Sequence, residues 1–442
     1  MTAQRTSVLK LALRAGPAIL IVACSPAARA AGAQLTNESA TDNSFAGFLS
    51  DQRVTTLVRS DYFQSSRTLD GRSNLAGAAL QVKALPSLTA SVDGKIEARL
   101  IDSDLGDNEA ADRSVNRLLE AYATIHFARA DLRLGKQIIA WGRADGINPT
   151  DNLTPRDYTV LLPFDEDQRF GTVALKLDTY LSRELSLTVF ATPFFEPSNI
   201  PIPAGAGLVN TKPAQTLSDS EFALKLNRTG GDFDWSVSYF HGRSLFPTLA
   251  AGPPAPLLPY LSYQHIDVVG ADFARNFGRY GFRSEVAYIR PTDRSATDPN
   301  VGSPRWFLVA GMDRTLLENL NFNLQFFTHR MSGYRNPADV FEPLQRSIAV
   351  ENAIILGQED RASNGVTFRM SNKWLNETLE AEIFTVVNFT RSDRYIRPLV
   401  TYAFSDQLKG TLGGELYRGS PSTQYGSLRN SSGVFAELRY GL

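Results

Sequence analysis

The feature that most constrains this chain is an alternation of apolar and polar residues with a period of two, repeated along most of its length. Between Leu320 and Phe326 every even position is apolar and every odd position carries an amide side chain. The segments 91–100 and 379–383 alternate in the same way. A period of two places successive side chains on opposite faces of a β-strand, so each segment predicts a strand with one apolar and one polar face.

About eighteen such segments follow one another, each close to the roughly ten residues that a tilted strand needs to cross a bilayer. In hydrocarbon every backbone amide must pair within the protein, so such a sheet has to close, and single-chain bacterial barrels use an even number of strands. We therefore predict an all-β fold, a transmembrane antiparallel β-barrel over residues 53–442. The strands are expected to begin near residues 53, 74, 88, 115, 131, 171, 185, 220, 232, 265, 280, 305, 320, 364, 378, 394, 408 and 432.

The connections between these segments alternate in length. Short periplasmic turns and long outer loops are the pattern of bacterial outer-membrane barrels. Segment 345–357 does not alternate and could be a helix or a strand; we assign it to a loop, because one more strand would make the number odd. Short turns are expected at 85–87, 128–130, 182–184 and 230–231, and long loops at 102–114, 143–170, 196–219, 244–263, 291–304, 331–363 and 419–430, with a tight turn at 391–393 as the exception.

Aromatic residues gather at both ends of the predicted strands. Amphipathic rings favour the boundary between membrane and water, so these residues predict two girdles around the barrel. The outer girdle is expected to include the pairs at 62–63, 194–195, 239–240 and 326–327, and the other girdle Phe127, Phe233, Trp235, Phe273, Phe282 and Phe404.

The N-terminus has the pattern of a secretory signal peptide. Basic residues and no acidic ones precede a short apolar core at 15–23, and small residues then flank a cleavage site after Ala30. A lipobox ending at Cys24 is the alternative for the same segment. Residues 31–52 are expected to form a short periplasmic segment. The last strand ends in alternating apolar residues, from Val434 to Leu442, which resembles the C-terminal signal that the barrel-assembly machinery recognises; the usual terminal residue there is Phe.

Charge and cysteine content exclude several function classes. Cleavage after Ala30 removes four basic residues, no acidic ones and the single cysteine, so the mature chain is net negative and has no thiol. A net negative chain argues against a nucleic-acid partner. Without cysteine, a disulfide, a cysteine metal site and a c-type haem attachment are excluded. We expect no cofactor and no metal, and as partners outer-membrane lipid, lipopolysaccharide and a small-molecule solute.

A short motif precedes the longest early loop. Gly135, Lys136 and Gln137 are followed after three residues by Trp141 and Gly142, and then by the sequence NPTD at 148–151. This motif resembles the G-[KR]-Q-x-x-x-W-G element of porin-like outer-membrane barrels, including alginate-export-type channels and an uncharacterised proteobacterial barrel family. The resemblance implies a channel or an outer-membrane transport accessory.

Strand number and the charged faces predict a wet lumen. Barrels of 16 to 18 strands leave an aqueous channel, whereas those of eight are filled by side chains. Loop 143–170 is expected to fold into this lumen as the third loop of general porins does, with acidic loop residues facing basic wall residues; an ordinary surface loop is the alternative. The candidate constriction residues are Arg143, Asp145, Asp151, Arg156, Asp157, Asp165, Glu166, Asp167 and Arg169, and the candidate lumen wall comprises Lys95, Glu97, Arg99, Arg283 and Arg369.

These features predict an outer-membrane channel for passive diffusion of small solutes. The alternative is a non-conducting barrel that serves as an accessory, assembly or attachment factor for an export system or surface polymer. A barrel hydrolase is not expected, because none of the four histidines is part of the His-x-Ser pair of outer-membrane phospholipases. His265 and Asp267 alone share a strand face as a possible acid–base pair.

Overall fold

The computed structural model describes residues 53–65, 73–103, 114–159, 164–200, 208–210, 213, 215–252 and 255–442. The expected signal peptide with its Ala30 cleavage site, and the segment 31–52, lie outside the described residues. Among the described residues, no helix has the length and apolarity to cross a membrane.

Eighteen strands of the described chain form a closed antiparallel barrel, in which each strand pairs with its neighbours in chain order. The first and last strands close the ring, with Leu57 opposite Gly441 and Ser65 opposite Gly433. These staves are β1 (Thr55–Ser65), β2 (Asn74–Ala84), β4 (Val92–Ser103), β5 (Ser114–Phe127), β6 (Ala130–Gln137), β7 (Thr172–Tyr180), β8 (Leu185–Thr192), β10 (Glu221–Arg228), β11 (Asp234–Arg243), β14 (His265–Phe277), β15 (Tyr280–Pro291), β16 (Arg305–Leu316), β17 (Leu320–Met331), β18 (Ala362–Trp374), β19 (Leu379–Asn388), β20 (Asp393–Ala403), β21 (Leu408–Arg418) and β22 (Gly433–Gly441).

The predicted fold class and strand number are therefore confirmed. The largest displacement is at the third stave, which begins at Val92 because a three-residue strand, β3 (Ser87–Thr89), forms a small hairpin with it first. Segment 345–357 lies in a loop, as predicted, and is helical: α2 runs from Pro343 to Leu356.

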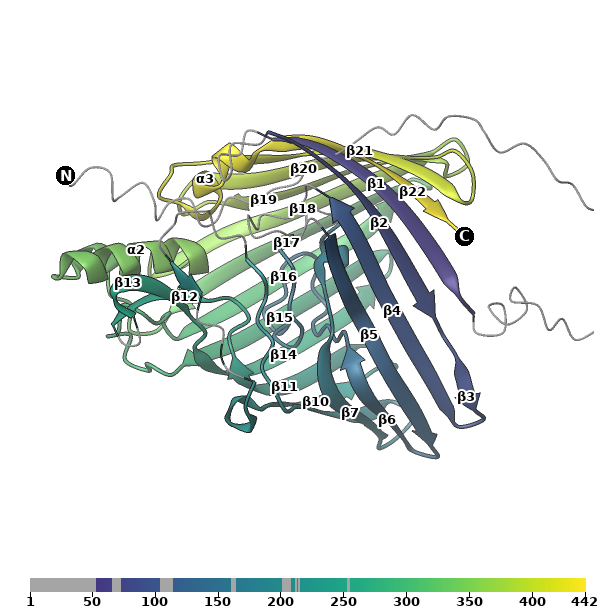
Figure 1. Ribbon diagram of the computed structural model, residues 1–442, viewed down its shortest axis with the longest axis horizontal. Helices are drawn as coiled ribbons and strands as arrows, with labels where there is room; N and C mark the ends of the chain where they lie inside the picture. The colour runs from purple at the N-terminus through teal and green to yellow at the C-terminus, as the bar shows by residue number, and fades with distance from the viewer. Residues whose placement is uncertain are drawn as a thin grey trace, which may run out of the picture.

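The long connections gather at one end of the barrel and the short turns at the other (Figure 1), except for the tight turn between β19 and β20, which lies at the loop end as predicted. At the loop end, β12 (Thr248–Gly252) and β13 (Ala255–Ser262) form a hairpin, and β9 (Val209–Asn210) pairs with β13. Helix α2 packs against the hairpin through the buried side chain of Ile348. The elements in the loops are η2 (Asp165–Gln168), β9 (Val209–Asn210), η3 (Leu217–Asp219), β12 (Thr248–Gly252), β13 (Ala255–Ser262), η4 (Pro337–Asp339), α2, α3 (Gln424–Ser427) and η5 (Arg429–Ser431).

Strand alternation divides the aromatic residues between the two faces of the barrel. Exposed rings such as Trp306 and Phe404 lie on the outer surface. One member of each predicted outer-girdle pair is instead buried inside: Phe63, Phe195, Phe240 and Phe327. The prediction that both members belong to a girdle was therefore wrong, because adjacent residues of an extended strand point to opposite faces.

Candidate functional site

The loop between β6 and β7 leaves the wall at the motif that the sequence singled out. Gln137 ends β6 fully buried, and its side-chain amide donates to the carbonyl oxygen of Ala174 on β7 at 2.8 Å. Trp141 is buried against the inner wall, with the ammonium of Lys225 over its ring at 5.6 Å from the centroid. The motif thus anchors the point at which the chain turns from the wall into the lumen.

The next contact of the loop with this wall is made by the backbone that follows Gly142, against Glu285 on β15. The backbone N–H groups of Arg143 and Ala144 both donate to one carboxylate oxygen of Glu285, and the hydroxyl of Thr150 donates to the other oxygen at 3.1 Å. Gly142 has φ of +104°, and a Cβ atom there would lie 2.6 Å from the same carboxylate. Only glycine therefore lets the backbone come this close in this conformation.

The Arg143 guanidinium is bound by three strands of that wall. It contacts Asp272 on β14 at 2.5 Å, Asp234 on β11 at 3.2 Å and the side-chain oxygen of Asn227 on β10 at 2.7 Å. Several partners on rigid strands hold a planar guanidinium in one orientation. The start of the loop is thereby attached to the wall formed by β10, β11, β14 and β15.

Asp145 attaches the loop to a second wall. Its carboxylate lies 2.8 Å from the guanidinium of Arg369 on β18, which also contacts Glu382 on β19 at 2.8 Å. Arg369 therefore bridges an acidic loop residue and an acidic wall residue in the lumen.

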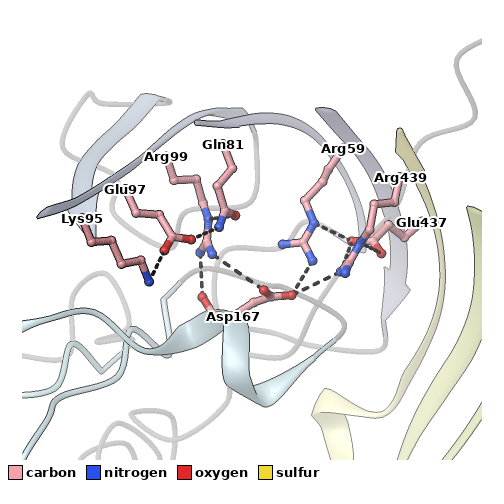
Figure 2. Close-up of polar contacts among 8 residues, drawn as sticks. All are labelled: Arg59, Gln81, Lys95, Glu97, Arg99, Asp167, Glu437 and Arg439. Atoms are coloured by element: carbon pink, nitrogen blue, oxygen red, sulfur yellow. Dashed lines mark hydrogen bonds and ion pairs between the residues drawn. The ribbon is translucent and has the colours of Figure 1, made fainter. Parts of the chain in front are cut away.

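Asp167, in the short helix η2, attaches the end of the loop to a third wall (Figure 2). Its side chain pairs with Arg59 on β1, with Arg439 on β22 at 3.3 Å and with Arg99 on β4 at 3.8 Å. Arg99 also donates to the backbone carbonyl of Asp167 at 2.6 Å. Three guanidinium groups thus converge on one loop carboxylate.

A chain of polar contacts extends from these arginines along the wall. Glu437 on β22 contacts Arg59 at 3.0 Å and Arg439 at 3.1 Å. On the other side Arg99 donates to Gln81 on β2 at 3.1 Å, and Gln81 in turn donates to Glu97. Figure 2 shows Glu97 reaching Lys95, at 2.7 Å, so charges of both signs alternate along this part of the lumen wall.

Further polar contacts hold the middle of the loop, some within the loop and some with its surroundings. Asp151 pairs with Arg169 and lies 3.9 Å from Arg156. Asp157 pairs with Arg117 on β5 at 2.8 Å and accepts from the amide of Asn199 at 2.9 Å. These contacts fix the middle of the loop near the outer end of the barrel.

Apolar contacts inside the barrel support the same path. Ile139, Trp141 and Leu153 pack with inward-facing residues of the wall, among them Phe240 and Ile266. At the other end Phe164 packs against the cluster that contains Phe63 and Phe435, and the guanidinium of Arg439 lies 4.9 Å from the Phe164 ring centroid. The lumen is therefore partly apolar where the loop touches it, which the polar strand faces alone did not predict.

The loop spans the lumen. Counting the staves in chain order, β1 is the first of eighteen and β14 the tenth, so Asp167 and Arg143 are attached to opposite walls. A cavity of about 180 Å³ remains between the loop and the wall of β18 to β20, lined by Glu166, Arg369 and Arg397 among others. A larger cavity, of about 590 Å³, lies on the outer side of the loop.

Most of the residues singled out in loop 143–170 lie in this assembly, and a few predicted residues do not. Arg283 pairs with Asp313 at 3.3 Å near the short turns, away from the loop. The side chain of Asp165 lies outside the described part of the chain. The wall residues Arg59, Asp272, Glu285 and Arg439 contact the loop although they were not among the predicted site residues. Arg59, Glu285 and Arg439 stand on the polar faces of alternating strands, and that pattern is the signal that points to them. Asp272 shares its face of β14 with the apolar residues Ile266 and Val268, so alternation does not identify it.

The histidine that could have belonged to a hydrolytic pair is on the outer surface of the barrel. Asp267 contacts His241 at 2.8 Å and Arg290 at 2.5 Å, while His265 stacks beside His241. Ile266 and Val268, the neighbours of Asp267, are buried on the inner face. His265 and Asp267 therefore point away from the lumen.

Comparison with solved structures shows the same fold in bacterial channels. The outer-membrane protein OpdK from Pseudomonas aeruginosa superposes with a TM-score of 0.53 at 12% identity, covering 88% of this chain and 98% of that chain. OccAB3 from Acinetobacter baumannii has a TM-score of 0.53 at 10% identity, with 88% and 98% covered. A structure of OpdK with vanillate has a TM-score of 0.52 at 10% identity, with the same coverage.

Sequence comparison adds the family. No curated protein shows significant similarity to the chain. The model of a family described as a protein of unknown function (DUF1302) matches residues 49–306, which is more than half of the chain. The protein therefore belongs to the DUF1302 family, and its fold is that of an outer-membrane β-barrel resembling Occ/OprD-family channels.

Proposed function

We propose that this protein is an outer-membrane channel through which small solutes diffuse passively, and that loop 143–170 narrows its polar lumen. The observation that carries the proposal is the attachment of the loop to opposite walls, through Arg143 on one side and Asp167 on the other. A loop held across a lumen of eighteen strands reduces the open cross-section and places charged groups beside any solute that passes.

The charges at the narrowing are arranged with opposite signs on facing surfaces. Asp167 and Asp145 of the loop face arginines of the wall, and Arg143 of the loop faces acidic residues of the wall. Charged groups that line a pore set which ions pass. The fold resemblance to channels supports conduction over the alternative of a non-conducting accessory barrel.

The test is single-channel recording in planar bilayers with the triple variant Asp165→Asn, Glu166→Gln and Asp167→Asn. Removing these carboxylates takes away the loop partner of Arg59, Arg99 and Arg439, although Arg59 and Arg439 keep Glu437. The lumen becomes more positive there, so we expect the chloride-to-potassium permeability ratio to rise severalfold. The reversal potential in a salt gradient measures this ratio.

A matched control removes the same number of charges near the short turns: Asp313→Asn, Glu318→Gln and Asp406→Asn. This control should change the reversal potential much less. A silent bilayer with well-folded protein would contradict conduction and favour the accessory role. Steady conductance with an unchanged reversal potential in the loop variant would remove the loop from ion selection.

A further inference from the structure

The membrane-facing surface of the barrel carries charge of a single sign on seven neighbouring strands. Alternation turns every second residue of β15 to β21 outward, away from the lumen. In these strands, all of which lie in the described part of the chain, each charged residue that faces outward is an arginine and none is acidic. They are Arg290 on β15, Arg314 on β16, Arg330 on β17, Arg394 on β20 and Arg418 on β21. All of them except Arg314 stand at the loop end, so this surface is positive on the side that faces outside.

Strand length places these arginines at the boundary of the apolar membrane core. On β15, β17 and β21 the arginine lies ten residues from the outward-facing residue at the short-turn end, which is Tyr280, Leu320 and Leu408 respectively. At about 3.3 Å per residue and a tilt of about 35 to 45°, ten residues rise about 23 to 27 Å along the membrane normal. The apolar band of such barrels is about 25 Å tall. The guanidinium groups therefore reach the level of the lipid head groups of the outer leaflet.

Aromatic side chains mark the same level. Trp306 is directly opposite Arg330 and is exposed, and its ring lies against Tyr288 with 4.9 Å between the centroids. Phe389, in the tight turn that precedes Arg394, is exposed as well. Tryptophan and tyrosine favour the boundary between membrane and water. Two independent features, strand length and aromatic position, thus give the arginines the same depth.

Arg394 and Arg418 are directly opposite each other on β20 and β21, which lie side by side (Figure 1). Side chains in such a pair have Cβ atoms about 4.5 to 5.5 Å apart, and like charges there are destabilising. Both side chains are exposed. Among the described residues no carboxylate pairs with either guanidinium, and Arg418 donates only to the carbonyl oxygen of Tyr417 at 2.9 Å and to the Ser432 hydroxyl at 3.5 Å. The pair therefore lacks a negative partner.

The other arginines at this level are not placed in the same way. Arg290 already pairs with Asp267 on β14 at 2.5 Å. Arg330 is flanked by uncharged residues, Trp306 on β16 and Ala362 on β18, so its charge stands alone. Two adjacent guanidinium groups bind a multiply charged anion better than one does. Arg394 and Arg418 are therefore the strongest anion-binding position on this face.

We propose that Arg394 and Arg418 bind a phosphate group of lipopolysaccharide, the glycolipid of the outer leaflet of the bacterial outer membrane. Each guanidinium donates N–H groups to phosphate oxygens, and the phosphate removes the repulsion between the two arginines. Ile396 and Leu416, the next outward-facing pair toward the membrane core, contact the acyl chains of the same lipid. The inference does not rest on the proposed channel function, because it concerns the surface that faces the lipid and not the lumen.

Native mass spectrometry tests this site on the full chain, purified in a mild detergent, freed of outer-membrane lipid and titrated with diphosphoryl lipid A. We expect the double variant Arg394→Gln with Arg418→Gln to bind lipid A about tenfold or more weakly than the wild type. The double variant Arg394→Lys with Arg418→Lys should retain part of the binding, because lysine keeps the charge and loses the forked donor geometry. Lipid A should also raise the unfolding temperature of the wild type more than that of the glutamine variant.

The matched control is Arg275→Gln with Arg314→Gln, since both arginines face outward near the short turns, at the opposite boundary of the membrane. This control should bind lipid A as the wild type does, and heat-dependent gel mobility checks that every variant is folded. Equal lipid A binding by the wild type and the Arg394 and Arg418 glutamine variant, or an equal loss in the control, would overturn the proposal. Phosphatidylglycerol that binds as tightly as lipid A would overturn it too, because the surface would then recognise lipid phosphates in general.

Discussion

At the scale of single residues, Gly142 allows the backbone of the loop to lie directly against the Glu285 carboxylate of the lumen wall. Its φ of +104° and the 2.6 Å between a built Cβ atom and the Glu285 carboxylate leave no room for a side chain. We predict that Gly142→Ala displaces the start of the loop from Glu285, at a cost of about 1 to 3 kcal/mol in loop stability. Limited proteolysis should then cut loop 143–170 faster, and single-channel records should become noisier.

Gly278→Ala is the control for this substitution. Gly278 also has a positive φ, of +59°, but nothing lies within 4 Å of its built Cβ atom, and it sits in a short turn. Both variants carry backbone strain, and only Gly142→Ala meets a carboxylate. Equal protease sensitivity of the loop in the two variants would mean that the contact with Glu285 does not hold the loop.

At the scale of elements, the sequence predicts strands better than it predicts the path of the loops. β17 begins at Leu320 and β15 at Tyr280, both as predicted, because alternation is a local property that each strand carries in its own residues. The path of loop 143–170 depends instead on contacts such as Asp167 with Arg439, which are far apart in the chain. Alternation identifies Arg439 as inward-facing, but no local pattern says which loop residue reaches it.

The outer loop that contains α2 carries a titratable group of its own. Burial raises the pKa of Glu359 to about 7, from an ordinary value of 4.5, and the neighbouring Asp393 adds to the rise. Because the pKa is higher in the folded loop, the folded form binds more protons. The contribution of Glu359 to loop stability is therefore fully present below about pH 4.5 and is lost as the pH rises through about 7.

We predict that opening of loop 332–361, measured by hydrogen exchange, increases between about pH 5 and about pH 8. Glu359→Gln should abolish most of this increase, because the amide is neutral throughout. Glu377→Gln, which removes an exposed carboxylate in a short turn, should leave it unchanged. The same pH dependence in Glu359→Gln as in the wild type would assign the effect to another group.

At the scale of the whole molecule, barrel closure and lumen narrowing are carried by different parts of the chain. The ladder between β1 and β22 closes the ring without any contribution from loop 143–170. Gln137 and Thr172, which flank the loop, are paired directly on adjacent strands. The chain therefore enters and leaves the lumen at neighbouring points, and a short linker can replace everything between them.

We predict that replacing residues 139–170 with a short Gly-Ser linker gives a barrel that still folds. Because eighteen strands without an inserted loop leave a wide aqueous channel, this variant should conduct several times more current than the full-length protein, with weaker ion selectivity. Arg59 and Asp272 on the wall would lose their loop partners, Asp167 and Arg143, and would face water instead. As a control, replacing residues 420–431, which include α3, with the same linker removes part of the lining of the 590 Å³ cavity on the outer side of the loop and should change the conductance little. Heat-dependent gel mobility checks folding, and bilayer recording gives the conductance. A folded barrel without residues 139–170 that conducts no more than the wild type would show that the current is limited elsewhere than at this loop.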